Sequence, residues 1–160
     1  MSTAYDIRDE LVLAFNGHDL RRLSQCYSPS AVLVGPEGVA EGQEQIATFW
    51  EQLLTAFLDA RLTPWYKATV SDPAVTEWCL TGTHMGPLLL PSGRHLEGTG
   101  RQVAIRGCCV LHVENDRIVT HQQYYDQLEL HSQLGFRHVC DCPCVSEQSP
   151  DRFPSTGAPE

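Results

Sequence analysis

The spacing of apolar residues changes near Asp59, and this change divides the chain into a helical part and a strand-rich part. Before Asp59, apolar residues recur every three or four positions over residues 43–58, at Ile46, Phe49, Trp50, Leu53, Leu54 and Phe57. This spacing predicts a helix with one apolar face. Similar but shorter patterns predict helices over residues 5–15 and 20–26, the second of which begins at the capping carboxylate of Asp19.

After Asp59 the pattern is that of β-strands. Strand-like segments cover residues 61–70, 74–84, 102–114 and 117–126, and a short strand is predicted at residues 31–34. Asn115 and Asp116 join the last two long segments as a hairpin. Helices followed by antiparallel strands indicate an α+β domain, in which a curved sheet wraps around helix 43–58 and encloses a cone. The interior of such a cone is either filled by side chains or holds a ligand.

The length and charge of the chain limit what it can bind. Its 160 residues suffice for one domain, with 11 Lys and Arg against 20 Asp and Glu and a net charge of -9. Because no basic cluster offsets this acidity, we expect neither nucleic acid nor a membrane surface as a partner. No apolar run reaches about 18 residues, and the charged first ten residues do not resemble a signal peptide, so we expect a cytoplasmic protein.

Two segments depart from the regular pattern. Residues 86–100 are rich in proline and glycine, and we expect this long connection to cover the interior or to move as a flap. Beyond residue 136 the composition shifts to proline, serine, cysteine and acidic residues. We therefore predict a domain over residues 1–136 and a disordered tail over residues 137–160.

The seven cysteines are predicted to be thiols, because an odd number cannot all pair. Four of them lie in apolar surroundings and are expected to be small buried side chains: Cys26, Cys79, Cys108 and Cys109. The other three, Cys140, Cys142 and Cys144, lack the spacing of a zinc knuckle. We therefore predict no metal and no cofactor, with metal storage or redox signalling by this tract as the alternative.

Asp126 is the first candidate for catalysis. It ends the last predicted strand and shares a face of that strand with Gln122 and Tyr124. If this face lines the interior, desolvation raises the pKa of the carboxyl group, which can then take up and return a proton at neutral pH. The alternative is a strand-end aspartate that caps the following turn.

The register of the hairpin decides whether His112 and Arg106 join Asp126. A three-residue turn with a bulge puts His112 opposite residue 118 and Arg106 opposite Tyr124, on the face that carries Asp126. A two-residue loop of Asn115 and Asp116 exchanges the faces, and the sequence leaves both registers open. His112 is then a proton partner or an ordinary histidine, and Arg106 a substrate contact or half of a salt bridge.

Other candidate substrate contacts are aromatic or lie at the mouth of the cone. Trp50, Trp65, Tyr27 and Tyr124 could line a pocket for a flat ligand, or belong to the core. His84 ends a strand where the long connection begins, and it either contacts a ligand or terminates the strand. No G-x-S-x-G, phosphate-binding loop or H-E-x-x-H motif is present, which argues against covalent, nucleotide and zinc-hydrolase chemistry.

Taken in order, several short segments resemble the SnoaL-like polyketide cyclases of the NTF2-like superfamily over residues 5–136. These segments are Phe15-Asn16-Gly17-His18-Asp19, Tyr27-Ser28-Pro29, Glu41-Gly42-Gln43-Glu44-Gln45-Ile46, Ala56-Phe57-Leu58-Asp59, Gly82-Thr83-His84-Met85-Gly86-Pro87, Tyr124-Tyr125-Asp126 and Gln133-Leu134-Gly135. The chain departs from the family pattern at Leu58, where proline is common, and at Asp116, where glycine is usual.

The resemblance implies an NTF2-like, cone-shaped barrel and a cofactor-free aldol ring closure of a hydrophobic, polyketide-like carbonyl compound. It implies that Asp126 is the general acid and base, that His112 assists it, and that Trp50 and Tyr27 line the pocket. By analogy with the fold, two copies are expected to form a homodimer. Two alternatives remain: a relative that isomerises double bonds or opens epoxides, and a non-catalytic module for ligand binding or dimerisation.

Overall fold

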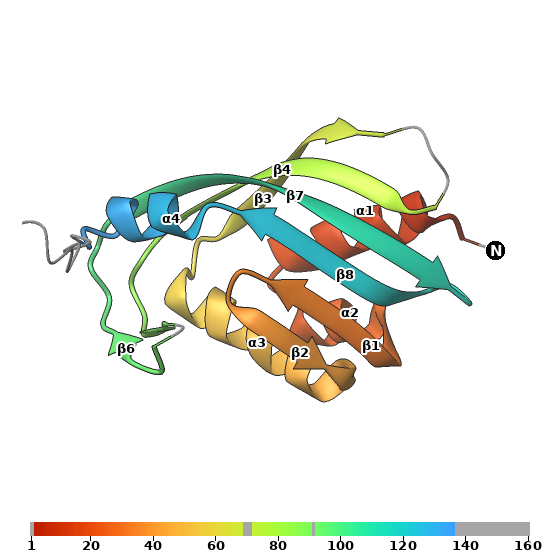
Figure 1. The fold of residues 1–160 in the computed structure, drawn as a ribbon, viewed down its shortest axis with the longest axis horizontal. Coiled ribbons are helices and arrows are strands. Elements are labelled where there is room, and N and C mark those ends of the chain that lie inside the picture. Colours follow the sequence, from red (N-terminus) through yellow and green to blue (C-terminus); the bar gives the residue numbers. More distant parts are fainter. Residues whose placement is uncertain (1, 69–71, 91, 137–160) are drawn as a thin grey trace, which may run out of the picture.

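The computed structural model describes residues 2–68, 72–90 and 92–136 (Figure 1). Its helices are α1 (Ala4–Asn16), α2 (Leu20–Gln25), α3 (Gly42–Ala56) and α4 (Gln127–Gln133). The helices predicted near residues 5–15, 20–26 and 43–58 are thus confirmed. Side chains cap two of them, since Thr3 accepts a hydrogen bond from the backbone of Asp6 and Asp19 accepts one from the backbone of Arg22. None of the helices in the described residues is long and apolar enough to cross a membrane.

The strands form a mixed sheet. They are β1 (Tyr27–Gly35), β2 (Gly38–Glu41), β3 (Arg61–Lys67), β4 (Ala74–Thr83), β5 (Leu88–Leu89), β6 (His95–Leu96), β7 (Gln102–Glu114) and β8 (Arg117–Tyr125). Within the described residues the main sheet has the order β2-β1-β8-β7-β4-β3, in which only β1 and β8 pair in parallel. The sheet is curved but open, with β2 and β3 as its edges, so the expected α+β fold is confirmed without a closed barrel.

The core lies between the concave face of this sheet and the N-terminal helices, which cover that face (Figure 1). Phe15 from α1 and Ile46 and Trp50 from α3 are buried, as are Ile105 of β7 and Ile118 of β8. Full burial of one such side chain stabilises the fold by roughly 1.5–3 kcal/mol. The predicted apolar face of residues 43–58 therefore packs into the sheet.

The hairpin between β7 and β8 has the two-residue loop. Glu114 pairs with Arg117, and Asn115 and Asp116 both have positive φ, 49° and 59°, which suits the twist of a tight hairpin. The pairing register then shifts between Val113 and His112, so that Val113 pairs with Ile118 whereas His112 pairs with Thr120. The three-residue turn considered from the sequence is absent, and this register decides which β8 side chains face the core.

The connection over residues 86–100 folds against the end of α3. The backbone N–H groups of Met85 and Gly86 both donate to the carbonyl of Ala56, at 3.0 and 3.1 Å. A Cβ atom at Gly86 would lie 2.2 Å from the carbonyl oxygen of Thr55, so glycine permits this approach. The short strands β5 and β6 are thereby held beside the helix, near the mouth of the cone. The tail and the tract of Cys140, Cys142 and Cys144 lie outside the described residues.

Candidate active site

A groove and two inner cavities follow one another between the sheet and α3. The groove has a volume of about 330 Å³ and lies between β1, β2, α3 and the β5 segment. The middle cavity, of about 70 Å³, shares Phe49, Leu53 and the leucines at 88–90 with the groove. The inner cavity, of about 40 Å³, shares Leu53, Trp78 and Gln123 with the middle one. The series leads from the surface into a mostly apolar interior, as small-molecule sites commonly do.

One row of polar side chains runs along the inner face of β8. His121 lines the inner cavity, Tyr125 lines the middle cavity, and Gln123 between them lines both. The three residues alternate along the strand, so the pleat directs them to one side. At about 3.3 Å per residue, the Cα atoms of His121 and Tyr125 are roughly 13 Å apart.

At the inner end, three buried side chains form a hydrogen-bonded chain. Trp50 Nε1 donates to the Tyr27 hydroxyl oxygen at 3.1 Å, and that hydroxyl lies 2.7 Å from His121 Nδ1. Burial lowers the pKa of His121 to about 3 and raises the pKa of Tyr27 well above its ordinary value. Both groups are therefore neutral at pH 7.

At the outer end, a carboxylate and a phenol form a pair. The Tyr125 hydroxyl donates to Glu37 Oε1, and Glu37, in the turn between β1 and β2, lines both the groove and the middle cavity. A Cβ atom at Gly35 would lie 2.6 Å from Glu37 Oε2, so this glycine lets the side chain fold back over the strand. Burial and the neighbouring carboxylate raise the pKa of Tyr125, which keeps the phenol protonated.

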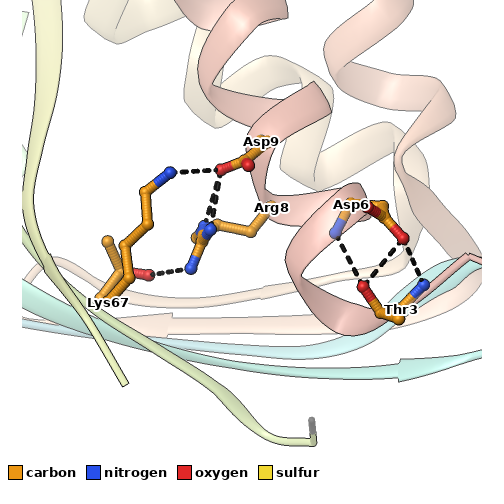
Figure 2. A network of polar contacts seen from close by, with 6 residues as sticks. Thr3, Asp6, Arg8, Asp9 and Lys67 are labelled. Atoms are coloured by element: carbon orange, nitrogen blue, oxygen red, sulfur yellow. Dashed lines mark hydrogen bonds and ion pairs between the residues drawn. The ribbon is translucent and has the colours of Figure 1, made fainter. Parts of the chain in front are cut away.

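Arg8 supplies a positive charge beside the inner cavity, which it lines together with His121. Its side chain is 3% exposed and lies 2.8 Å from Asp9 Oδ1, to which Lys67 Nζ also donates at 3.0 Å (Figure 2). Arg8 Nη1 donates to Thr76 Oγ1 at 3.3 Å. Partial burial disfavours the ionised form of Asp9, but hydrogen bonds from the two cations outweigh this and hold its pKa below the ordinary value.

Asp126 lies outside these cavities. It is exposed and is the N-cap of α4, accepting hydrogen bonds from the backbone N–H groups of Leu128 at 2.8 Å and Glu129 at 3.3 Å. Tyr124 is 55% exposed and donates to Gln122 on the outer face of β8. The expectation that Tyr124 and Asp126 point into the cone is therefore wrong, because the hairpin register turns this set of residues outward.

His112, Arg106 and Trp65 also lie on the outside. Arg106 is exposed, and His112 is half-buried with Nδ1 3.9 Å from Asp72 Oδ2. Trp65, on the edge strand β3, is 70% exposed. The structure thus keeps His112, Arg106 and Tyr124 on one face, as the sequence allowed, but this is the outer face of the sheet.

Tyr27 and Trp50 lie inside, where they were expected, but His84 has a different environment. His84 is fully buried and packs on Phe57, and none of the cavities described above is lined by it. Its Nδ1 lies 3.1 Å from Thr99 Oγ1 and accepts a hydrogen bond from the Thr99 backbone. His84 therefore ties the two ends of the 86–100 connection together.

The sequence analysis missed Arg8, Glu37, His121, Gln123 and Tyr125. A signal for the β8 residues was present in β7, where Val103, Ile105, Cys109 and Leu111 alternate with more polar positions. These odd-numbered residues are buried, which assigns His112 and Arg106 to the outside. No such pattern was present in the sequence for Glu37 or Arg8. The position of Glu37 depends on the turn between β1 and β2, and that of Arg8 depends on how α1 packs.

Within the described residues, no group of three or more His, Cys, Asp or Glu side chains is arranged to hold a metal ion. The polar side chains that line the two inner cavities include Glu37, Tyr125, Gln123, His121 and Arg8, and also Thr76, Gln127 and His131.

Solved structures with this fold include several proteins from bacteria. A candidate SnoaL-like polyketide cyclase from Jannaschia sp. CCS1 is 18% identical with a TM-score of 0.72, covering 82% of this chain and 90% of that one. IdmH, a candidate polyketide cyclase from Streptomyces antibioticus, is 26% identical with a TM-score of 0.70, covering 84% and 100%. AclR, a candidate hydroxylase from Streptomyces galilaeus, is 23% identical with a TM-score of 0.70, covering 82% and 95%.

No curated protein sequence matches this chain at a significant level. A family model described as SnoaL-like polyketide cyclase matches residues 5–134 and confirms the resemblance found in the sequence. The match spans all three N-terminal helices and the main sheet up to the end of α4. The chain therefore belongs to the SnoaL-like polyketide cyclase family.

Proposed function

We propose that this protein is a cofactor-free cyclase or isomerase that acts on a hydrophobic, polyketide-like carbonyl compound. Membership of the family supports a cyclase role, and the apolar groove with its inner cavities supports a hydrophobic substrate. The observation that carries the proposal is the pair of Glu37 and Tyr125, a carboxylate and a phenol on the wall of an apolar cavity. Such a pair can move a proton without a cofactor.

In the proposed reaction, Glu37 takes a proton from a carbon atom that lies between two carbonyl groups. The C–H bond breaks and an enolate forms, and once Glu37 carries the proton the Tyr125 hydroxyl turns from the carboxyl group to donate to the enolate oxygen. The nucleophilic carbon then attacks a second carbonyl carbon of the same molecule, which forms the ring bond and an alkoxide. Glu37 returns its proton to the alkoxide, so that the aldol closure balances without a further reactant.

Asp126 is a poorer candidate for this role. Both carboxylates are exposed, but that of Asp126 accepts two backbone hydrogen bonds from α4 and lines none of the cavities, whereas Glu37 lines the groove and the middle cavity. We therefore assign the transfer of the proton to Glu37 and keep Asp126 as the direct competitor in the experiment.

The test is hydrogen–deuterium exchange at the acidic carbon of an aromatic β-keto ester, followed by proton NMR in deuterated buffer. Exchange needs only the first proton transfer, so it does not depend on the natural substrate. We expect exchange with the wild-type protein to be faster than in buffer alone. Glu37→Gln should lower this enzyme-dependent exchange rate by about 10²–10⁴-fold, the usual contribution of a general base. Asp126→Asn is the matched control, because asparagine also caps helices well.

Three outcomes separate the hypotheses. Loss of exchange in Glu37→Gln with an unchanged Asp126→Asn supports the proposal. The reverse pattern moves the base to Asp126, as the family resemblance first implied. A wild-type rate equal to that of the buffer contradicts an acid–base enzyme and favours a non-catalytic ligand-binding module.

Ring closure and double-bond isomerisation share the same first step, so product analysis has to distinguish them. Mass and NMR analysis of a linear polyketide analogue would show a new carbon–carbon bond for a cyclase and only a shifted double bond for an isomerase. Formation of a homodimer remains a prediction from the fold class, and sedimentation velocity would test it.

A further inference from the structure

The inner cavity brings together polar groups that the proposed proton transfer does not use. Its lining includes the guanidinium-bearing Arg8 from α1 and His121 and Gln123 from β8. Apolar side chains, among them Leu11, Phe15 and Trp50, make up most of the rest. Buried polar groups in such surroundings normally have partners, so groups that face a cavity call for a ligand or water.

The chain of Trp50, Tyr27 and His121 determines which atom His121 presents. The indole N–H can only donate, so the Tyr27 oxygen accepts that bond. Because Tyr27 is fully buried, its own hydroxyl proton needs an acceptor, and His121 Nδ1 at 2.7 Å is that acceptor. The imidazole proton is then on Nε2. His121 therefore offers one N–H donor to the cavity that it lines.

Arg8 gives the same cavity a positive bias. Arg8 and Lys67 both bind the carboxylate of Asp9 (Figure 2), and of these three side chains only that of Arg8 lines the inner cavity. The bonds to Asp9 and Thr76 use only some of the N–H groups that a guanidinium carries. The mouth, in contrast, carries the carboxylate of Glu37. An anionic ligand is thus oriented with its charge inward.

The size of the cavity limits what it can hold. One water molecule needs roughly 10–15 Å³ of such space, so about 40 Å³ accommodates roughly three non-hydrogen atoms. A carboxylate group or a phenolate oxygen fits this volume, whereas an aromatic ring does not. The rings of a longer molecule would occupy the middle cavity and the groove.

We propose that the inner cavity is a subsite for a second acidic oxygen of the substrate, a phenolate or a carboxylate, bound by His121 Nε2–H and the Arg8 guanidinium. Trp50 and Tyr27 are positioning residues that hold the imidazole in the donating tautomer. This inference rests on the proposed function for its substrate class, but the binding it describes can be measured without turnover.

The test compares two probes of the same shape, 2-naphthoate and the neutral 2-naphthamide, by calorimetric titration at pH 7.5. Because hydrogen bonds to an ionised acceptor are roughly twice as strong as neutral ones, we expect the naphthoate to bind at least ~10-fold more tightly. Arg8→Met should abolish this preference. Arg106→Met is the matched control, since it removes an exposed arginine of the outer face and should leave the preference unchanged.

A second measurement uses the wild-type protein and covers the case in which Arg8→Met does not fold. The ¹⁵N spectrum of His121 should show a neutral ring protonated on Nε2, and naphthoate should shift that nitrogen more than naphthamide does. Tyr27→Phe should allow the proton to move to Nδ1. Equal affinity for the two probes, or a His121 signal that responds to neither, overturns the inference.

The two proposals fail in different ways. A preference for naphthoate without any exchange at the β-keto ester leaves the subsite in place and removes the proton transfer. Exchange without a preference for naphthoate contradicts the subsite and leaves the proposed proton transfer in place.

Discussion

The two faces of β8 carry similar residues with opposite environments. On the inner face, His121, Gln123 and Tyr125 line the cavities, and His121 is 2% exposed. On the outer face, Gln122 and Tyr124 bond to each other, and Tyr124 is 55% exposed. A glutamine and a tyrosine occur on both sides, so residue type alone does not distinguish the two faces. The register of one hairpin decides which of them can take part in chemistry.

The largest expected effect is on the free energy of unfolding, and it appears when two tryptophans on opposite sides of the sheet are compared. Trp50→Ala should lower the free energy of unfolding by about 3–5 kcal/mol, because it empties a packed site and removes the donor to Tyr27. Trp65→Ala, at an exposed site of the edge strand, should change it by no more than about 0.5 kcal/mol. Urea unfolding followed by circular dichroism measures both. Equal losses would show that the cavity wall is not where the structure places it.

The next effect is the pH dependence that buried His121 confers. Its pKa is about 3 in the folded protein against 6.5 as the ordinary value, so between these pH values the unfolded chain binds a proton that the folded chain does not. Stability is therefore fully present above pH 6.5 and is lost as the pH falls toward 3. At pH 5 the loss from this group should be about 2 kcal/mol.

Urea unfolding at pH 7.5 and pH 5 measures this loss. His121→Asn should show a smaller fall than the wild type, whereas His95→Asn, which removes an exposed histidine, should show the same fall. Burial also lowers the pKa of His84, so part of the fall remains in every variant. An identical fall in His121→Asn and wild type would contradict a neutral, buried His121.

The smallest effect tests the capping role of Asp126. Asp126→Ala should cost about 1 kcal/mol by leaving two backbone N–H groups of α4 without their acceptor, and Asp126→Asn only a few tenths. Thermal unfolding of both variants gives the difference. If Asp126→Ala is as stable as the wild type, the carboxylate does not cap the helix in solution.

Much of the fold follows from periodicity in the sequence. The face formed by Ile46, Trp50 and Leu54 predicted α3 and its packing, and alternation predicted the long strands. The parallel pairing of β1 with β8 was not predicted, because it joins residues that are far apart in the chain and leaves no local pattern.

The site was harder to predict than the fold. Tyr27 and Trp50 were recognised as lining residues, since buried aromatics follow the apolar pattern. Asp126 was expected inside if the strand face that it shares with Gln122 and Tyr124 lines the interior, and the direction of that face depends on a single step of register. Glu37 reaches the cavity only through the turn between β1 and β2, which local sequence does not specify.

The most direct test of the account compares Tyr125→Phe with Tyr124→Phe in the deuterium-exchange measurement. These variants remove the same hydroxyl from neighbouring residues on opposite faces of β8, and neither changes the packing volume appreciably. We predict that Tyr125→Phe lowers the enzyme-dependent exchange rate by at least ~10-fold, while Tyr124→Phe leaves it within about twofold of the wild type. Equal rates for the two variants, or a larger loss in Tyr124→Phe, would contradict the assignment of the chemistry to the inner face.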